Sequence, residues 1–234
     1  MESEVDIRLA YLVGGANSHR SKRLRMRVTG RIGAELRTRG FVGFCRFVQT
    51  RLWQVREDVL FELQIPRSAD AVTRRLDSVV QVDSRNLGSE ATAVVERCVL
   101  TAENFAYREA LQGDDRLFAA TDGDGHVTSY GFVLFDSFYK TVLGETVQVP
   151  MIGNCFTFPA HRRRGLYARL LVSITDRLAE AGYTRVIITC APDNLASVQG
   201  IRNAGFRHVR TLRTCIVLSR WIVIQTTVAT DAVT

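Results

Sequence analysis

Residues 159–171 read PAHRRRGLYARLL, and this stretch decides the fold that we predict for the chain. It joins a strand candidate at 145–158, which Pro159 ends, to a helical pattern at 165–181 that Gly182 stops. The helix has apolar residues on one face, namely Leu166, Leu170, Leu171, Ile174 and Leu178. A helix that begins directly after a strand directs its first backbone N–H groups outward, without partners inside the helix. The junction therefore predicts a site for phosphate oxygens.

The side chains at this junction suit an anionic ligand. The helix dipole adds positive potential where the N–H groups converge, and Gly165 permits close approach of the backbone. Arg162, Arg163 and Arg164 can add ionic contacts to a diphosphate or a 3′-phosphate. The pattern is neither a P-loop, because Lys-Ser/Thr does not follow, nor the dinucleotide fingerprint with its three spaced glycines. Taken by itself, a structural glycine beside a solvated arginine run explains the stretch equally well.

The sequence on either side of the junction alternates between strand and helix patterns. Downstream, a short buried strand at 184–190 is followed by a helix that Asp193 or Asn194 can cap and Gly205 ends, before a last strand region. Asp122–Gly125 reads DGDG, a hairpin turn, because the spaced oxygen ligands and closing Glu of a calcium loop are missing. The upstream elements are strands at 58–65, 78–82, 116–121 and 126–135, and helices at 91–99 and 103–111. This order predicts an α/β fold with a mixed sheet.

Two motifs together resemble those of the GNAT acetyltransferase superfamily. PAHRRRGLYARLL is similar to the family pattern Arg/Gln-x-x-Gly-x-Gly/Ala, in which Arg162 and Gly165 match while Tyr167 stands where Gly or Ala is usual. About thirty residues later, NLASVQGIRNAGF matches a second motif through Asn194, Ser197, Gly205 and Phe206. The resemblance spans about residues 78–218 and is strongest over 150–206.

This resemblance implies a GNAT-like mixed, splayed β-sheet flanked by helices, with the coenzyme between diverging parallel strands at about 150–158 and 184–190. It implies acetyl-CoA as the acyl donor, an amine as the acceptor, and no metal. The implied coenzyme-binding residues are Phe156, Thr157 and Phe158 for the pantetheine arm, Arg162, Arg163, Arg164, Gly165, Leu166 and Tyr167 for the pyrophosphate, and Asn194 further along. A fainter likeness of residues 107–132 to members found in bacterial polysaccharide biosynthesis would suit an amino-sugar acceptor.

The catalytic residues are not fixed by the motifs. Many members of the family place a Tyr seven residues after the second-motif Asn as the general acid, but this chain has Ile201 there. Because this tyrosine is missing, the protein could instead be a GNAT-like sensor that binds an acyl-coenzyme without transferring the acyl group. His161 and His126 are interpreted as loop and turn residues. The substitutes near the motifs are Ser197, Tyr167, Cys155 and Glu145.

The chain before the motifs carries the excess positive charge. The whole chain has a net charge of +7, whereas residues 20–56 alone hold eleven Arg or Lys against one acid, Glu35. Within this segment Phe41, Phe44, Val48, Leu52 and Val55 recur at helical spacing and predict a basic amphipathic helix. Three interpretations remain: a solvated helix packed on the domain, attachment to an anionic membrane surface, or nucleic-acid binding. No recognisable nucleic-acid motif accompanies the charge, so we expect no nucleic-acid partner. A membrane-surface adaptor with a GNAT-like fold, in which Arg162 to Arg164 extend this basic face, is an alternative function.

Composition places the protein among ordinary globular chains. Hydrophobic residues make up 46% and charged residues 24%, and the five cysteines lie far apart, so neither a disulfide framework nor a zinc site is predicted. No secretory signal is recognised at the acidic start, so we expect a cytoplasmic protein, with membrane association through residues 20–56 left open. We expect three regions: a loosely ordered tail at 1–25, an extension with a basic amphipathic helix and a strand at 26–77, and an acyltransferase domain at 78–234. A homodimer of the protein is left open.

Deleting residues 1–25 should leave the affinity for coenzyme A unchanged within about twofold, because the implied binding residues all lie beyond residue 150. Calorimetric titration of the two chains measures this. A large loss of affinity, or strong resistance of residues 1–25 to proteases, would contradict the interpretation of this segment as a tail.

Overall fold

The computed structural model describes residues 53–66, 74–101, 104–217 and 220–228. The described residues fall into two units, one that holds 53–57 and those of 212–227, and one that holds those of 58–211 together with 228. The second unit contains both motifs that the sequence analysis singled out. No helix in the described part of the chain is long and apolar enough to cross a membrane.

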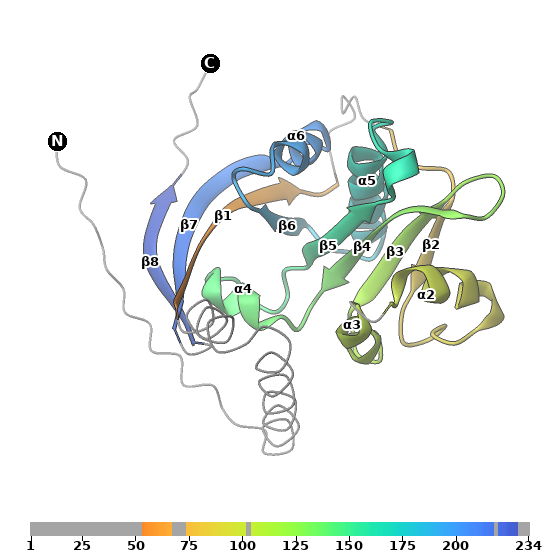
Figure 1. Cartoon of the computed structure of the whole chain (residues 1–234), viewed down its shortest axis with the longest axis horizontal. Helices are drawn as coiled ribbons and strands as arrows, with labels where there is room; N and C mark the ends of the chain where they lie inside the picture. Colours follow the sequence, from red (N-terminus) through yellow and green to blue (C-terminus); the bar gives the residue numbers. More distant parts are fainter. Residues whose placement is uncertain (1–52, 67–73, 102–103, 218–219, 229–234) are drawn as a thin grey trace, which may run out of the picture. The chain divides into compact units, whose positions relative to one another are not determined.

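The described strands form one mixed sheet in the order β2-β3-β4-β5-β6-β1-β7-β8 (Figure 1). The strands are β1 Trp53–Gln64, β2 Val79–Val82, β3 Arg116–Thr121, β4 Val127–Leu134, β5 Met151–Thr157, β6 Arg185–Cys190, β7 Arg207–Val217 and β8 Arg220–Val228. The helices are η1 Glu90–Thr92, α2 Ala93–Val99, α3 Phe105–Ala110, α4 Phe138–Val142, η2 Pro159–His161, α5 Leu166–Glu180 and α6 Leu195–Asn203. The α/β fold with a mixed sheet is therefore confirmed.

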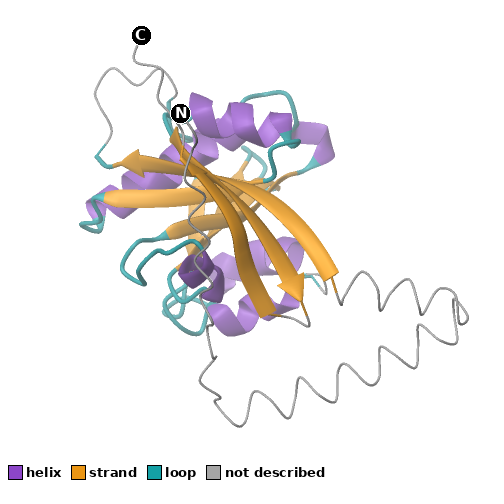
Figure 2. Ribbon diagram, turned by 90° about the vertical axis from the view of Figure 1, so that its left-hand side faces the viewer, coloured by secondary structure: helices purple, strands orange, loops and turns teal. Residues whose placement is uncertain are grey.

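Helices cover both faces of the central strands (Figure 2). Successive side chains of a strand point to opposite faces. On β3, Phe118 and Ala120 join the core under α5 and α6, whereas Leu117 and Ala119 join a second core under α2 and α3. The strand is thus buried on both faces, which explains its nearly continuous apolar sequence.

The structure differs from the predicted elements in three places. The strand predicted at 145–158 is confined to Met151–Thr157, and the helix α4 was not predicted. Val55, assigned to the basic amphipathic helix, lies in β1 instead, because strand pairing overrides the helical spacing there. The rest of that helix, the tail at 1–25 and most of the basic segment lie outside the described residues.

A buried lysine explains why residues 145–150 do not extend β5. Lys140 is 1% exposed, and its Nζ atom donates to the carbonyls of Phe135 at 2.9 Å and Val147 at 2.8 Å. Burial lowers the pKa of Lys140. Because this side chain gathers two separate carbonyl groups around α4, the segment before β5 stays a turn rather than a strand.

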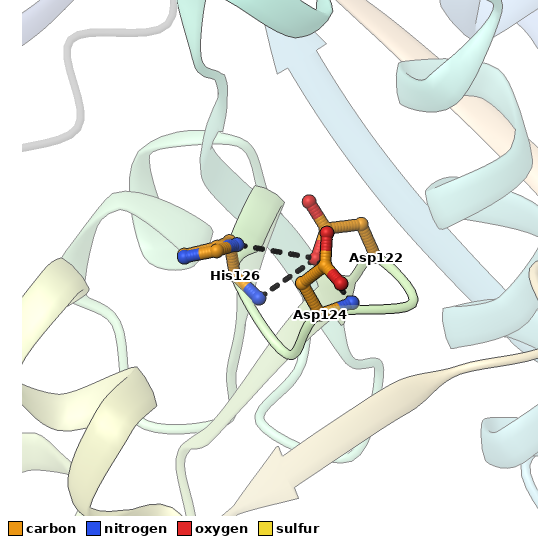
Figure 3. Close-up of side chains that lie close together, drawn as sticks. All are labelled: Asp122, Asp124 and His126. Atoms are coloured by element: carbon orange, nitrogen blue, oxygen red, sulfur yellow. Dashed lines mark hydrogen bonds and ion pairs between the residues drawn. The ribbon is translucent and has the colours of Figure 1, made fainter.

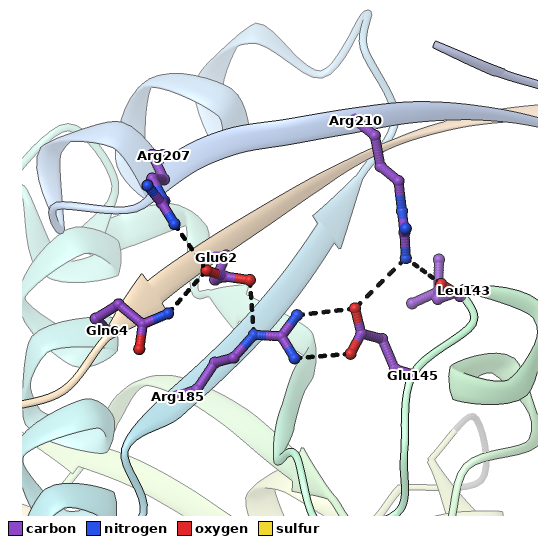
Figure 4. A network of polar contacts seen from close by, with 7 residues as sticks. All are labelled: Glu62, Gln64, Leu143, Glu145, Arg185, Arg207 and Arg210. Atoms are coloured by element: carbon purple, nitrogen blue, oxygen red, sulfur yellow. Dashed lines mark hydrogen bonds and ion pairs between the residues drawn. The ribbon is translucent and has the colours of Figure 1, made fainter. Parts of the chain in front are cut away.

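An ionic network joins β1, β6 and β7 to the turn before β5 (Figure 4). Glu62 on β1 accepts from Arg185 Nε at 2.6 Å and from Arg207 Nη2 at 3.1 Å. Arg185 also donates to both carboxylate oxygens of Glu145, each at 2.9 Å. Burial acts to raise the pKa of Glu62, but the hydrogen bonds from Arg185 and Arg207 outweigh it, so that the pKa is lowered. The network fixes the start of β6 to β1 and β7 and to the turn before β5.

Replacing Glu62 by Gln should lower the free energy of unfolding at pH 7 by about 2 kcal/mol, because two arginines lose their charged acceptor. Since folding lowers the pKa of Glu62, its carboxylate stabilises the fold above its unfolded pKa of about 4.3 and loses this effect as the pH falls through the folded value. The difference between the two proteins in urea unfolding should therefore shrink between about pH 5 and pH 3.

Glu180→Gln is the matched control, because its pair with Arg177 is more than half exposed on both sides and should change stability by less than about 0.5 kcal/mol. Equal losses in both variants would contradict a structural role for the network.

Candidate active site

The parallel strands β5 and β6 part soon after they begin to pair. Their last pair is Ile152 with Ile188, although β5 continues to Thr157 and β6 to Cys190. On its other side β5 stays paired with β4 as far as Thr157. Within the described residues, the edge of β5 that faces the gap therefore has no strand partner. The splay predicted between residues 150–158 and 184–190 is confirmed.

A β-bulge marks the point where the strands part. The register between β4 and β5 shifts so that Gly131 faces two residues of β5, Asn154 and Cys155. Asn154 has a φ of 45°, in the left-handed region that Asn tolerates better than most residues. A Cβ atom on Gly131 would lie 2.8 Å from Cys155 Sγ, so any larger residue there would force this sulfur to move. The extra residue bends β5 and turns it from β6.

The start of α5 forms an anion cradle, defined as the backbone of residues 163–167. Gly165 caps the helix with a φ of 70°, and Arg163 has a φ of 61°. The first helical hydrogen bond is donated by Arg169 to the carbonyl of Gly165, at 3.1 Å. Within the described part of the chain, the N–H groups of residues 163–167 have no protein acceptor. Free N–H groups at the start of a helix can bind an anion, so the diphosphate site that the sequence predicts stays a prediction with donors available for it.

The three arginines of the junction have different surroundings. Arg162 donates from Nε to the carbonyl of Thr157 at 3.0 Å, and its guanidinium lies 5.5 Å from the centroid of the Phe156 ring. It thereby ties the cradle to the end of β5. Arg163 is exposed, and Arg164 lines a cavity of about 400 Å³ beside the cradle. Positive side chains therefore gather next to the free N–H groups, which favours an anion there.

Asn194 caps α6. The sequence leaves either Asp193 or Asn194 as the cap. The Oδ1 atom of Asn194 accepts from the N–H of Ser197 at 3.2 Å, and the Asn194 side chain is exposed while Ser197 is half-buried. This cap uses the side-chain oxygen and leaves the amide Nδ2 without a described protein partner. The cap alone accounts for Asn at this position, and contact with a coenzyme stays a prediction.

Tyr167 occupies the space between α5 and α6. A Cβ atom on Gly200 would lie 2.9 Å from Cε1 of the Tyr167 ring, so α6 accommodates the ring through a glycine. Burial raises the pKa of Tyr167 well above its ordinary value, the nearby thiols of Cys155 and Cys190 act in the same direction, and a hydrogen bond with Ser197 opposes them. These neighbours belong to β5, β6 and α6. The phenol therefore lies at the gap between the splayed strands.

The other candidates for catalysis are less suited to it. Burial raises the pKa of Cys155 to about 12, so the thiol is not a thiolate near neutral pH. Glu145 is held by Arg185 in the network behind β6. Ile201 is fully buried in the core under α5 and α6. His161 ends the short η2 turn, in agreement with its interpretation as a loop residue.

The Asp122–Gly125 turn is built as predicted (Figure 3). Asp122 Oδ1 accepts from the N–H groups of Asp124 at 3.1 Å and His126 at 2.8 Å. The hydrogen bond from the His126 backbone is the main reason why the pKa of Asp122 is lowered. The side chains of Asp122, Asp124 and His126 lie close enough to share an ion, but the two backbone hydrogen bonds already account for the position of the Asp122 carboxylate without one.

A pocket that the sequence analysis missed opens at the bulge, with a volume of about 350 Å³. It is lined by Cys98, Thr101, Asn104, Tyr130, Asn154, Cys155, Phe156 and Phe158. Of these, only Cys155, Phe156 and Phe158 had been considered for the site. Asn104 and Asn154 lie fifty residues apart and belong to no motif, so only the bulge brings them together. We refer to this cavity as the bulge pocket.

Comparison with known proteins agrees with the resemblance. A family model described as the acetyltransferase (GNAT) family matches residues 89–206. No curated protein matches the chain.

Similar solved structures include a GNAT acetyltransferase from Colwellia psychrerythraea, with 15% identity, a TM-score of 0.48, and coverage of 74% of this chain and 57% of that one. A GCN5-related N-acetyltransferase from Sphaerobacter thermophilus has 15% identity, a TM-score of 0.46, and coverage of 82% and 59%. The aminoglycoside N-acetyltransferase AAC(6′)-Iy in complex with CoA has 21% identity, a TM-score of 0.42, and coverage of 56% and 91%. The chain thus spans less than two-thirds of the first two structures.

Gly165→Glu should lower the affinity for coenzyme A by about 100-fold or more, because it places a carboxylate among the donors of the cradle. An added Cβ atom meets no protein atom within 4 Å, so the effect would come from the ligand and from strain at a φ of 70°. Isothermal calorimetry with coenzyme A measures it.

Gly182→Glu is the matched control at the other end of α5, because Gly182 has a φ of 86° and equally open surroundings. Unchanged affinity in Gly165→Glu, or an equal loss in both variants, would remove the cradle from the binding site.

Proposed function

The chain belongs to the GNAT family of acetyltransferases, because the family model matches half of it, and from this premise we propose that it moves an acetyl or other short acyl group from acetyl-CoA to the amine of a small molecule. The observation that carries the proposal is the gap between β5 and β6 directly beside the anion cradle. An extended ligand with a phosphorylated end fits this combination. When bound, acetyl-CoA supplies an acyl group activated as a thioester.

The cradle and the strand edge would position the two ends of the donor. Backbone N–H groups of Gly165, Leu166 and Tyr167 would hold the pyrophosphate, with Arg163 and Arg164 adding charge. The unpaired edge of β5 at residues 153–157 would hold the arm and bring the thioester to the bulge. Fixing both reactants in one place removes up to about 7 to 11 kcal/mol of the barrier in well-oriented cases. A free N–H group at the bulge would stabilise the oxyanion by about 3 kcal/mol.

Tyr167 would take the role that the family gives to the missing tyrosine. Its ring enters from α5 instead of α6, and Gly200 makes room for it. Burial keeps the phenol protonated across the neutral pH range, so that its O–H group can donate to the sulfur as the carbon–sulfur bond breaks. The amine nitrogen forms the new bond to the carbonyl carbon, and the proton that it releases passes through water to the departing thiolate. Tyr167 is unchanged at the end of the cycle.

A sensor that binds the acyl-coenzyme without transfer is the second candidate, favoured by the buried Ile201 in place of the family's tyrosine. Continuous measurement of free thiol with acetyl-CoA and a panel of amines separates the two functions. Amine-dependent release supports the transferase. Tight coenzyme binding with no release above the rate of hydrolysis for any amine supports the sensor.

Tyr167→Phe should lower kcat by about 10- to 100-fold while leaving the Kd for coenzyme A unchanged, because it removes one hydrogen bond to a developing charge and keeps the packing on Gly200. Tyr183→Phe, whose ring packs on Phe135, is the control and should retain full activity. Steady-state kinetics and calorimetry give the two constants. Loss of coenzyme affinity in parallel with kcat would indicate that Tyr167 acts only through packing.

A further inference from the structure

The bulge pocket lies on the face of the sheet that α2 and α3 cover. Tyr130 and Phe158 belong to the core on this face, whereas α5, which carries the cradle, packs on the opposite face. The pocket reaches the bulge through Asn154, Cys155 and Phe156, which border the gap between β5 and β6. A molecule in the pocket could therefore meet a thioester in the gap from the side opposite the cradle.

A backbone carbonyl fixes the direction of the hydrogen bonds that join Asn104 to Tyr130 and Asn154. The carbonyl of Val99 can only accept, so the atom of Asn104 that lies 2.9 Å from it must be the amide Nδ2. The second hydrogen of this Nδ2 is donated to the Tyr130 hydroxyl at 3.0 Å. Asn104 Oδ1 must then accept, and it does so from Asn154 Nδ2 at 2.9 Å. The orientation of both amides follows from the position of Val99.

This chain of hydrogen bonds leaves one donor and one acceptor for a ligand. The Tyr130 oxygen already accepts from Asn104, so its own O–H hydrogen is free to donate, and it has no acceptor among the described residues. Asn154 uses its Nδ2 toward Asn104, and its Oδ1 atom has no described donor. A hydroxyl group is the simplest partner for both, because it accepts from one atom and donates to another.

The walls of the pocket favour a ring. Phe156 lies edge-on to Phe158 with their centroids 5.3 Å apart, and the Tyr130 centroid lies 5.7 Å from that of Phe156 and 6.2 Å from that of Phe158. The three rings form an angled apolar wall. A volume of about 350 Å³ is at the lower end of the range for ligand pockets, which suits a molecule with a single ring.

The charge of the pocket disfavours ligands with additional ionised groups. None of its described lining residues is an acid, a lysine, an arginine or a histidine, and the Cys155 thiol is protonated. The described charge next to a lining ring is positive, the Arg162 guanidinium over Phe156. A second ammonium group or a carboxylate would meet no oppositely charged side chain among these lining residues, and its desolvation would cost free energy.

We propose that the bulge pocket binds the acceptor, and that the acceptor is a hydroxylated amine with one ring and no other ionised group. This inference rests on the proposed function. The ring would lie against Tyr130, Phe156 and Phe158, the hydroxyl would bridge Tyr130 and Asn154, and the amine would point toward the gap. An amino sugar and a phenolic amine share this chemistry.

The test compares amines that differ in one property. Tyramine and phenethylamine differ only in the hydroxyl group. Glucosamine and cyclohexylamine compare a hydroxylated sugar ring with a ring that has no hydroxyl groups. Spermidine adds cations and glutamate adds carboxylates. Measured by thiol release, kcat/KM for tyramine should exceed that for phenethylamine about tenfold, or kcat/KM for glucosamine should exceed that for cyclohexylamine about tenfold. The better of these hydroxylated amines should exceed spermidine and glutamate by about the same factor. A faster reaction with tyramine would identify the acceptor as a phenolic amine, and a faster reaction with glucosamine would identify it as an amino sugar.

Tyr130→Phe should reduce the preference for the hydroxyl from about tenfold to about onefold and leave the Kd of coenzyme A unchanged. Tyr107→Phe is the control, because Tyr107 on α3 stacks on Phe132 and is not among the lining residues of the pocket. The proposal is overturned if spermidine or glutamate is the best acceptor, or if Tyr130→Phe keeps the full preference.

Ligand-detected NMR with coenzyme A present measures binding of the same amines separately from transfer. Selective binding of the hydroxylated rings without thiol release would support the pocket assignment and count against the proposed transferase. Thiol release with spermidine or glutamate alone would support the transferase and overturn the assignment.

Discussion

One extra residue in β5 sets the geometry on which the rest of the site depends. Because Gly131 faces both Asn154 and Cys155, β5 bends at the position where its pairing with β6 ends. The same bend opens the gap toward the start of α5 and creates the bulge pocket on the other face of the sheet. A side chain at Gly131 would collide with the Cys155 sulfur, so this glycine is as important to the site as Gly165 is to the cradle.

The gap also requires that β6 stay in place after it leaves β5. On its far side β6 pairs with β1 from Val59 opposite Cys190 to Gln64 opposite Arg185. Arg185 is held between Glu62 and Glu145 at the end where β5 and β6 are still paired. The strand is therefore anchored by hydrogen bonds and charge on the side away from the gap, and its free edge can serve a ligand instead of another strand.

The sequence predicted the parts of this structure that depend on local patterns. The apolar face of α5, the turn at Asp122–Gly125, the cap at Asn194 and the splayed strand pair all follow from spacing or from matched motifs. It could not predict the short β5, because the carbonyls that Lys140 gathers are known only from the fold. Likewise, a bulge has no composition of its own, so Asn104 and Asn154 did not stand out before the strands were paired.

The separation of the cradle and the bulge pocket by the sheet has a consequence for the order of events in a catalytic cycle. With the cradle at the start of α5 and the pocket under α2 and α3, the two proposed ligands would bind on opposite faces of the sheet, so neither would need to leave before the other arrives. A ternary complex assembled in either order is then the natural route. With the Cys155 thiol protonated, there is no reason to expect a covalently acylated protein or the parallel-line kinetics that accompany one.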